Sequence, residues 1–157
     1  MNLFTRIDNT LVSFFKKYGI VSLRVSLGLV FFWFGFLKFF PNISPAEVLA
    51  TRTINVITFG LIPHDVSIKV LALWETLIGI GLLTNRAQRI TLFLLWSQMV
   101  GAWFPLIIFP KEMFVAFPFV LTLEGQYIVK NLVLIAASFV LAAHVHSVRF
   151  KLRRIPR

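Results

Sequence analysis

The sequence predicts an all-α integral membrane protein, a single-domain bundle of four transmembrane helices. Three observations support this fold class: the 157-residue chain is 58% hydrophobic and 14% charged, its mean hydropathy is +0.85, and it contains four long apolar segments. A soluble domain is nearer half apolar and a quarter charged, so this composition argues against a water-soluble fold. The sequence has no cysteine, which excludes disulfides, thiolate metal sites and iron–sulfur clusters.

The N-terminal segment, residues 1–17, precedes the first apolar run. Its apolar residues recur at helical spacing, at positions 4, 7, 11, 14 and 15, and its charged residues lie elsewhere. This pattern predicts a short amphipathic helix on the cytoplasmic surface of the membrane. We expect no cleavable signal peptide, because no small-residue cleavage site follows an early apolar run.

Each predicted span has about 20 mainly apolar residues, enough to cross ~30 Å of hydrocarbon. The spans cover residues 18–40, 66–84, 90–110 and 128–148. Between the first two spans, Ser44 as N-cap, Pro45 as first helical residue and Glu47 three residues after the cap predict a helix start. This short outer helix is expected over residues 45–59. The last connection is rich in aromatic residues and is expected at the membrane interface.

The basic residues predict the orientation of the chain, whose formal net charge is +10. Ten Lys and Arg residues flank the spans on one side and two flank them on the other. The ten are Arg6, Lys16, Lys17, Arg86, Arg89, Arg149, Lys151, Arg153, Arg154 and Arg157, and the two are Arg52 and Lys111. The positive-inside rule therefore places both termini in the cytoplasm. We interpret the basic tail, residues 149–157, as a contact for anionic lipid and not for nucleic acid.

Charged residues within the spans are the main candidates for a functional site, because a charge near the bilayer centre normally faces protein and has a partner. In the first span, Arg24, Gly28, Gly35 and Lys38 fall on one helical stripe. In the second, Glu75 shares a stripe with Gly79. A buried pair of Glu75 with Arg24 is the leading expectation, and Lys38 could approach the same carboxylate from the outer side.

Glycines on these stripes are expected to let neighbouring helices approach closely. The positions assigned to helix packing are Gly28, Gly35, Gly79 and Gly101. Polar residues in the outer half of the bundle are the candidate ligand contacts, namely Lys38, Lys130, Gln98 and Glu124.

Two interpretations of this polar cluster remain open, with a third that the sequence favours less. The cluster can be a satisfied network that fixes helix register, with lysines reaching the outer interface. Alternatively, it can line a pocket for a lipid-soluble carbonyl compound such as a quinone. A proton pathway is less favoured, because only one carboxylate lies centrally in the spans. Three scattered histidines do not predict a metal site, and no nucleophilic triad or phosphate-binding loop is present.

The order of these motifs resembles the DoxX family of small four-helix membrane proteins. The resemblance lies in Arg24-x3-Gly28-x6-Gly35-x2-Lys38, in the segment ETLIGIGLL from Glu75 to Leu83, and in LEGQYIVKNLVLIAA from Leu123 to Ala137. It implies a bacterial or archaeal multi-pass protein, here expected in the bacterial inner membrane, and some members of the family have redox roles.

From the residues and the resemblance together, we expect a non-catalytic membrane subunit that binds a quinone-like ligand or supports a redox or stress-response partner. A purely structural subunit and a small oligomeric transporter are the alternatives. A protein partner or a homo-oligomer is compatible with each of these.

Overall fold

The computed structural model describes residues 3–41 and 43–153. Its elements, in chain order, are α1 (Leu3–Leu37), α2 (Glu47–Ile57), α3 (His64–Thr84), α4 (Gln88–Ile108), α5 (Pro110–Met113), β1 (Phe114–Ala116), β2 (Val120–Leu121) and α6 (Leu123–Arg153). Within the described residues, four helical stretches are long and apolar enough to cross a membrane: Phe4–Leu37, His64–Thr84, Gln88–Ile108 and Leu123–Val145. The fold class predicted from the sequence is therefore confirmed.

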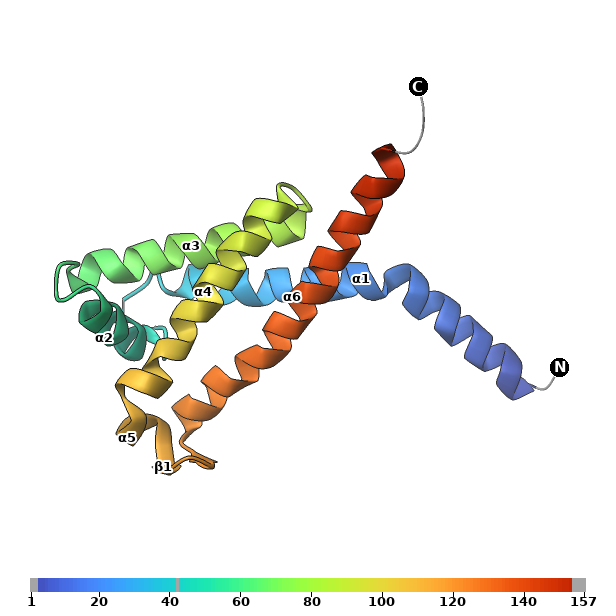
Figure 1. The fold of residues 1–157 in the computed structure, drawn as a ribbon. Coiled ribbons are helices and arrows are strands. Elements are labelled where there is room, and N and C mark those ends of the chain that lie inside the picture. The colour runs from blue at the N-terminus through green and yellow to red at the C-terminus, as the bar shows by residue number, and fades with distance from the viewer. Residues whose placement is uncertain (1–2, 42, 154–157) are drawn as a thin grey trace.

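The four long helices form a closed arrangement in which each contacts two neighbours. The most extensive contact joins α1 and α3, and further contacts join α3 to α4, α4 to α6, and α6 to α1. Apolar side chains from all four helices fill the space between them, including Leu27, Ile78, Leu82, Leu95 and Leu141. We call the end that carries α2, α5 and the small hairpin the outer end, and the opposite end, where α3 turns into α4, the inner end (Figure 1).

The first helix differs in its extent from the sequence prediction. The amphipathic segment and the first span, predicted as separate helices, are one continuous helix from Leu3 to Leu37. No proline occurs in this stretch, so no residue in it removes a backbone hydrogen-bond donor. In Figure 1 the ribbon of α1 bends where it leaves the bundle, and its N-terminal part projects away from the other helices.

The outer connections are more structured than the sequence indicated. Helix α2 begins at Glu47 with Ala46 as its N-cap and without a side-chain capping hydrogen bond. The expected cap, Ser44, instead accepts a hydrogen bond from the Glu47 N–H through its backbone carbonyl at 3.1 Å, so Pro45 and Ala46 form a turn ahead of the helix. The last connection folds into α5 and an antiparallel hairpin of β1 and β2, which its aromatic-rich sequence does not predict.

The C-terminal end of the chain is covered only in part. The backbone of α6 continues to Arg153. The side chains of the predicted basic tail, residues 149–157, lie outside the part of the chain that is described.

Candidate functional site

Helices α1 and α3 approach each other closely through glycines. A Cβ atom added at Gly35 would lie 2.8 Å from Glu75 Cβ, and one added at Gly79 would overlap the backbone of Phe32. At Gly28 the added atom would lie 2.9 Å from a leucine side chain of α3. At Gly35 and Gly79 no larger side chain fits without movement of the helices, and at Gly28 a larger side chain would have to displace leucine side chains of α3. Their contacts set the register in which the outer end of α1 lies beside the middle of α3.

This register brings together three polar side chains, the buried Lys38 and Glu75 and the half-buried Gln98, which we call the polar centre. Lys38 Nζ lies 2.5 Å from Glu75 Oε2, and Gln98 Nε2 donates a hydrogen bond to Glu75 Oε1 at 2.9 Å. Lys38 also donates to the backbone carbonyl of Phe34 at 3.3 Å. The side chains of Lys38 and Glu75 are 6% and 11% exposed. Each carboxylate oxygen has a donor, which buried charges require.

Arg24 has a different role from the one predicted. Its guanidinium donates hydrogen bonds to the backbone carbonyls of Leu82 and Leu83, the latter at 3.1 Å. These carbonyls belong to the last turn of α3, where a positive charge is favourable, and the Leu82 carbonyl also accepts from the N–H of the C-cap residue Asn85 at 3.3 Å. This arrangement replaces the expected pair of Arg24 with Glu75. Glu75 lies seven residues before Leu82 on α3, or about 10 Å along the helix axis.

The remaining predicted residues lie away from the polar centre. Lys130 is exposed on α6, with its Nζ 5.2 Å from the ring centroid of Tyr127, and Glu124 is exposed in the first turn of the same helix. Of the four candidate ligand contacts, only Lys38 and Gln98 reach Glu75. Gly101 is not a packing position as predicted, because an added Cβ would meet no neighbouring atom within 4 Å.

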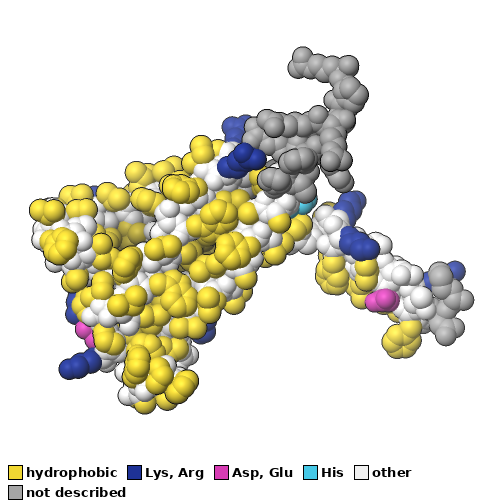
Figure 2. All heavy atoms as spheres, in the orientation of Figure 1, with side chains coloured by type: hydrophobic (Ala, Val, Ile, Leu, Met, Phe, Trp, Pro, Cys, Tyr) yellow, Lys and Arg dark blue, Asp and Glu magenta, His cyan; other side chains and the backbone are white. Residues whose placement is uncertain are grey.

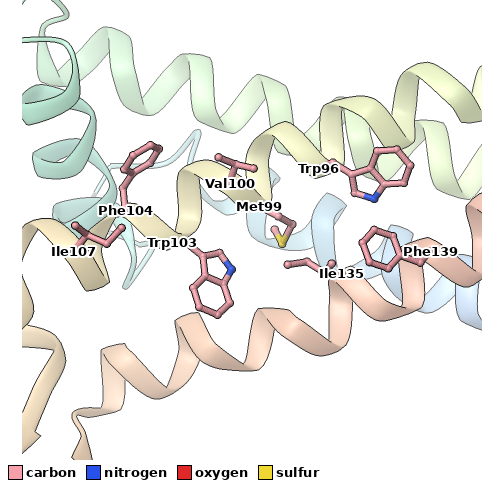
Figure 3. A pocket seen from close by; sticks show the side chains of 8 residues that line it. All are labelled: Trp96, Met99, Val100, Trp103, Phe104, Ile107, Ile135 and Phe139. Carbon is pink, nitrogen blue, oxygen red and sulfur yellow. The ribbon is translucent and has the colours of Figure 1, made fainter. Parts of the chain in front are cut away.

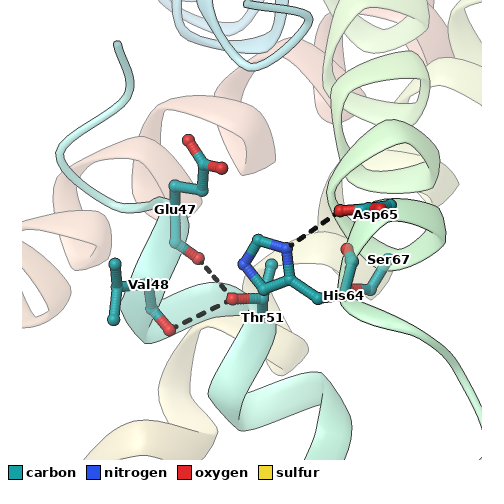
Figure 4. A network of polar contacts seen from close by, with 6 residues as sticks. All are labelled: Glu47, Val48, Thr51, His64, Asp65 and Ser67. Carbon is teal, nitrogen blue, oxygen red and sulfur yellow. Dashed lines mark hydrogen bonds and ion pairs between the residues drawn. The ribbon is translucent and has the colours of Figure 1, made fainter. Parts of the chain in front are cut away.

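Buried hydroxyl groups at the outer end are satisfied within their own helices (Figure 4). Thr51 donates to the backbone carbonyl of Glu47 at 2.8 Å, and a second contact of its hydroxyl, with the Val48 carbonyl, is 3.2 Å long. Ser67 donates to the His64 carbonyl at 2.8 Å. These hydroxyls hydrogen-bond to nearby backbone, as Ser and Thr commonly do in helices. Helix α2 packs against α3 independently of these hydrogen bonds.

An ion pair that was not predicted from the sequence connects α2 with α5. Arg52 Nη1 and Nη2 each lie 2.9 Å from a carboxylate oxygen of Glu112, and the guanidinium carbon lies 4.7 Å from the ring centroid of Phe109. The hydrogen bond from Arg52 lowers the pKa of Glu112, and the same bond raises the pKa of Arg52. The two residues are 60 positions apart, so only the predicted location of both on the outer side could have indicated the pair.

A groove of about 540 Å³ lies between α4 and α6 (Figure 3). Six residues of α4 and two of α6 line it, and all eight are apolar or aromatic. The volume lies within the range of ~300–1,000 Å³ that is usual for small-molecule sites. In the sequence, the α4 side of the groove corresponds to a run of large side chains at positions 96, 99, 100, 103, 104 and 107. This helical spacing could have indicated a continuous face in the third span.

The groove contains one polar group without a partner. Trp103 Nε1 is buried and has no hydrogen-bond partner among the described residues, and in Figure 3 its ring extends from α4 toward α6. Two other tryptophans have acceptors: the Trp96 indole donates to Ser138 Oγ at 2.8 Å, and that of Trp74 donates to a backbone carbonyl at 3.0 Å. A buried donor without an acceptor costs about 1–3 kcal/mol. Because this atom is covered by neighbouring atoms, an acceptor bound in the groove would remove this cost once the indole ring turned toward it.

Comparison with known families identifies the chain. The DoxX family model matches residues 19–108, more than half of its length. The chain belongs to the DoxX family. No curated protein and no solved structure matches it.

The DoxX match extends over the part of the fold that holds the polar centre. It covers the bundle portion of α1 together with α2, α3 and α4, and so includes Lys38, Glu75, Gln98 and the α4 side of the groove. Helix α6 lies outside the matched residues. With four helices suited to spanning, this DoxX-family chain is a multi-pass membrane protein.

Proposed function

We propose that this DoxX-family protein is a non-catalytic membrane subunit that binds a quinone-like, lipid-soluble carbonyl compound in the groove between α4 and α6. The observation that carries the proposal is the buried, unpartnered indole N–H of Trp103 in a groove with an apolar lining. Such a site is complementary to a ligand with a flat apolar body and one accessible acceptor oxygen. A quinone ring with an isoprenoid tail has this chemistry.

The polar centre supports the groove indirectly and does not itself contact the ligand. Both oxygens of Glu75 already have donors, and the bond from Gln98 joins α4 to α3. Gln98 thereby fixes the rotation of α4 about its axis, and this rotation sets the direction in which Trp103 points. This assignment differs from the hypothesis drawn from the sequence, in which the ligand contacts were Lys38, Lys130, Gln98 and Glu124.

The proposal places the protein in the bacterial inner membrane with both termini in the cytoplasm. The distribution of basic residues supports this orientation, since Arg86 and Arg89 lie in or beside the α3–α4 connection at the inner end. A reporter fused to the C-terminus that is active only in the cytoplasm should be active. A reporter active only outside the cytoplasm should be silent at the same position.

The binding experiment uses the full chain in lipid nanodiscs and a short-chain ubiquinone analogue as the probe. Saturable quenching of tryptophan fluorescence reports binding. Trp103→Phe keeps an aromatic ring and removes the N–H, so the Kd should rise about two- to tenfold, the contribution of one hydrogen bond. Trp33→Phe is the matched control, because Trp33 is 65% exposed on α1 and does not line the groove. Its Kd should equal that of the wild type.

A carbonyl-free analogue with the same tail distinguishes the hydrogen bond from general partitioning into lipid. It should bind wild type and Trp103→Phe with equal, weaker affinity. Linear, non-saturable quenching by the quinone in the wild type refutes the proposal and favours a purely structural subunit. Equal quinone affinity of wild type and Trp103→Phe refutes the role of Trp103.

A further inference from the structure

The N-terminal part of α1, residues 4–18, projects from the bundle, and we call it the arm (Figure 1). At ~1.5 Å per residue the 35 residues of α1 span about 52 Å, whereas the hydrocarbon core is ~30 Å thick. About 20 Å of the helix must therefore lie beyond the hydrocarbon if α1 crosses the bilayer directly. Every residue of the arm is exposed. No described residue of the bundle covers it.

One face of the arm is wholly apolar. At ~100° per residue, Phe4, Ile7, Leu11, Phe14 and Tyr18 fall within a sector of about 80°. Their exposed fractions range from 42% for Tyr18 to 89% for Phe4. A face of this width in water would leave a large apolar patch unburied, which marks an interaction surface.

The other face is basic. Arg6, Lys16 and Lys17 lie outside the apolar sector, and Asp8 is the single acidic residue of the arm. Figure 2 shows basic and hydrophobic side chains on different sides of the arm. Lys17 Nζ lies 5.1 Å from the ring centroid of Tyr18, at the point where the arm meets the spanning part of α1. An apolar face flanked by cations is typical of helices that lie in the interface of anionic membranes.

We propose that the arm lies in the plane of the membrane surface and binds anionic lipid headgroups, so that its attachment depends on the charge of the bilayer. The arm is continuous with the spanning part of α1, which holds it at the membrane surface. The apolar face enters the headgroup boundary, and Lys16 and Lys17 contact phosphate groups at the bend. The bilayer is the preferred occupant because its geometry and charge match both faces at once.

The absence of cysteine from the sequence allows single spin labels to test the arm in the full chain. Leu11→Cys places a label on the apolar face, and Ser13→Cys, about 200° away around the helix, is the matched control on the polar face. Collision rates with oxygen and with a water-soluble nickel chelate are measured in nanodiscs of phosphatidylcholine with and without phosphatidylglycerol. In anionic discs the Leu11→Cys label should be accessible to oxygen and protected from nickel, and the Ser13→Cys label should be accessible to nickel.

Charge dependence is tested by Lys16→Gln and Lys17→Gln in the Leu11→Cys background. Each substitution should lower the bound-to-free ratio of the arm in anionic discs about fivefold, the contribution of one surface cation, and should have no effect in neutral discs. Equal nickel accessibility of the two labels in anionic discs overturns the proposal. Protection of the Leu11→Cys label that is the same in neutral and anionic discs also overturns it, because attachment of the arm would then not depend on the charge of the bilayer.

Discussion

The Lys38–Glu75 pair gives the most direct test of how the bundle is stabilised. Lys38→Met keeps a long apolar stem and removes the cation, leaving the carboxylate of Glu75 buried beside Gln98 alone. At the observed 2.5 Å separation, an effective dielectric constant of ~20 gives a gross attraction of ~7 kcal/mol. Desolvation offsets part of this attraction. Removing one partner of a buried pair is therefore expected to cost about 3–5 kcal/mol.

The double variant Lys38→Met with Glu75→Gln should recover most of this loss. The amide that replaces the carboxylate still accepts a hydrogen bond from Gln98 and leaves no uncompensated charge, and replacing a buried ion pair by neutral groups is often close to neutral. The free energy of unfolding is measured in mixed detergent micelles titrated with a denaturing detergent. Lys69→Met is the control, because Lys69 is exposed on the same helix as Glu75, and it should change stability by less than about 0.5 kcal/mol.

Two results would refute this reasoning. One is a cost of less than about 1 kcal/mol for Lys38→Met, which would mean that water or another cation reaches Glu75. The other is a double variant that loses more stability than the two single variants lose together. The double-mutant cycle would then show no favourable coupling between the residues.

Three further predictions concern the glycine contacts, the end of α3 and the outer ion pair. Gly79→Ala should destabilise by about 1–3 kcal/mol in the same unfolding assay through overpacking, whereas Gly101→Ala should be neutral or slightly stabilising; equal effects would contradict the contact assignment. Arg24→Met should destabilise by about 1–3 kcal/mol and speed hydrogen exchange at the inner end of α3, and unchanged exchange would contradict its capping role. The folded-state pKa of Glu112 is lowered from its ordinary 4.5 mainly by a hydrogen bond from Arg52, so the pair stabilises fully above pH 4.5 and loses its contribution as the pH falls through the lowered value. The stability difference between wild type and Glu112→Gln should therefore be present at pH 7 and vanish in acid, and a difference that persists in acid would show a non-electrostatic cause.

The sequence predicted the features of the site that follow from helical periodicity. Gly28, Gly35 and Gly79 lie on stripes that the heptad spacing identifies, and all three lie at close contacts between α1 and α3. The need for a partner to Glu75 follows from the cost of a charge in the bilayer. Which cation is the partner of Glu75 depends on the offset between α1 and α3 along their axes. The glycine contacts set this offset, so the sequence alone did not decide between Lys38 and Arg24.

Other features depend on contacts between distant segments and could not be read from the sequence. The unpartnered N–H of Trp103 is recognisable only when the acceptors around every tryptophan are known. Lys130 and Glu124 share the expected depth in the membrane with the polar centre but face outward on α6, since depth alone does not determine the rotation of a helix. The continuity of the arm with the first span depends on the absence of a helix stop near residue 18, where the sequence suggested a boundary.

The placement of the Lys38–Glu75 ion pair has a consequence for how the chain is assembled during its synthesis. Both members of the pair lie in the first half of the chain, with Lys38 directly after α1 and Glu75 on α3, and these two helices associate through glycines. The ribosome completes these two helices before α4 and α6 exist. They can therefore enter the bilayer together as a hairpin in which Lys38 and Glu75 have already neutralised each other, so that neither charge crosses the hydrocarbon alone. Gln98 then binds to a polar centre in which the two charges already neutralise each other. The groove beside Trp103 forms last, when α6 packs against α4.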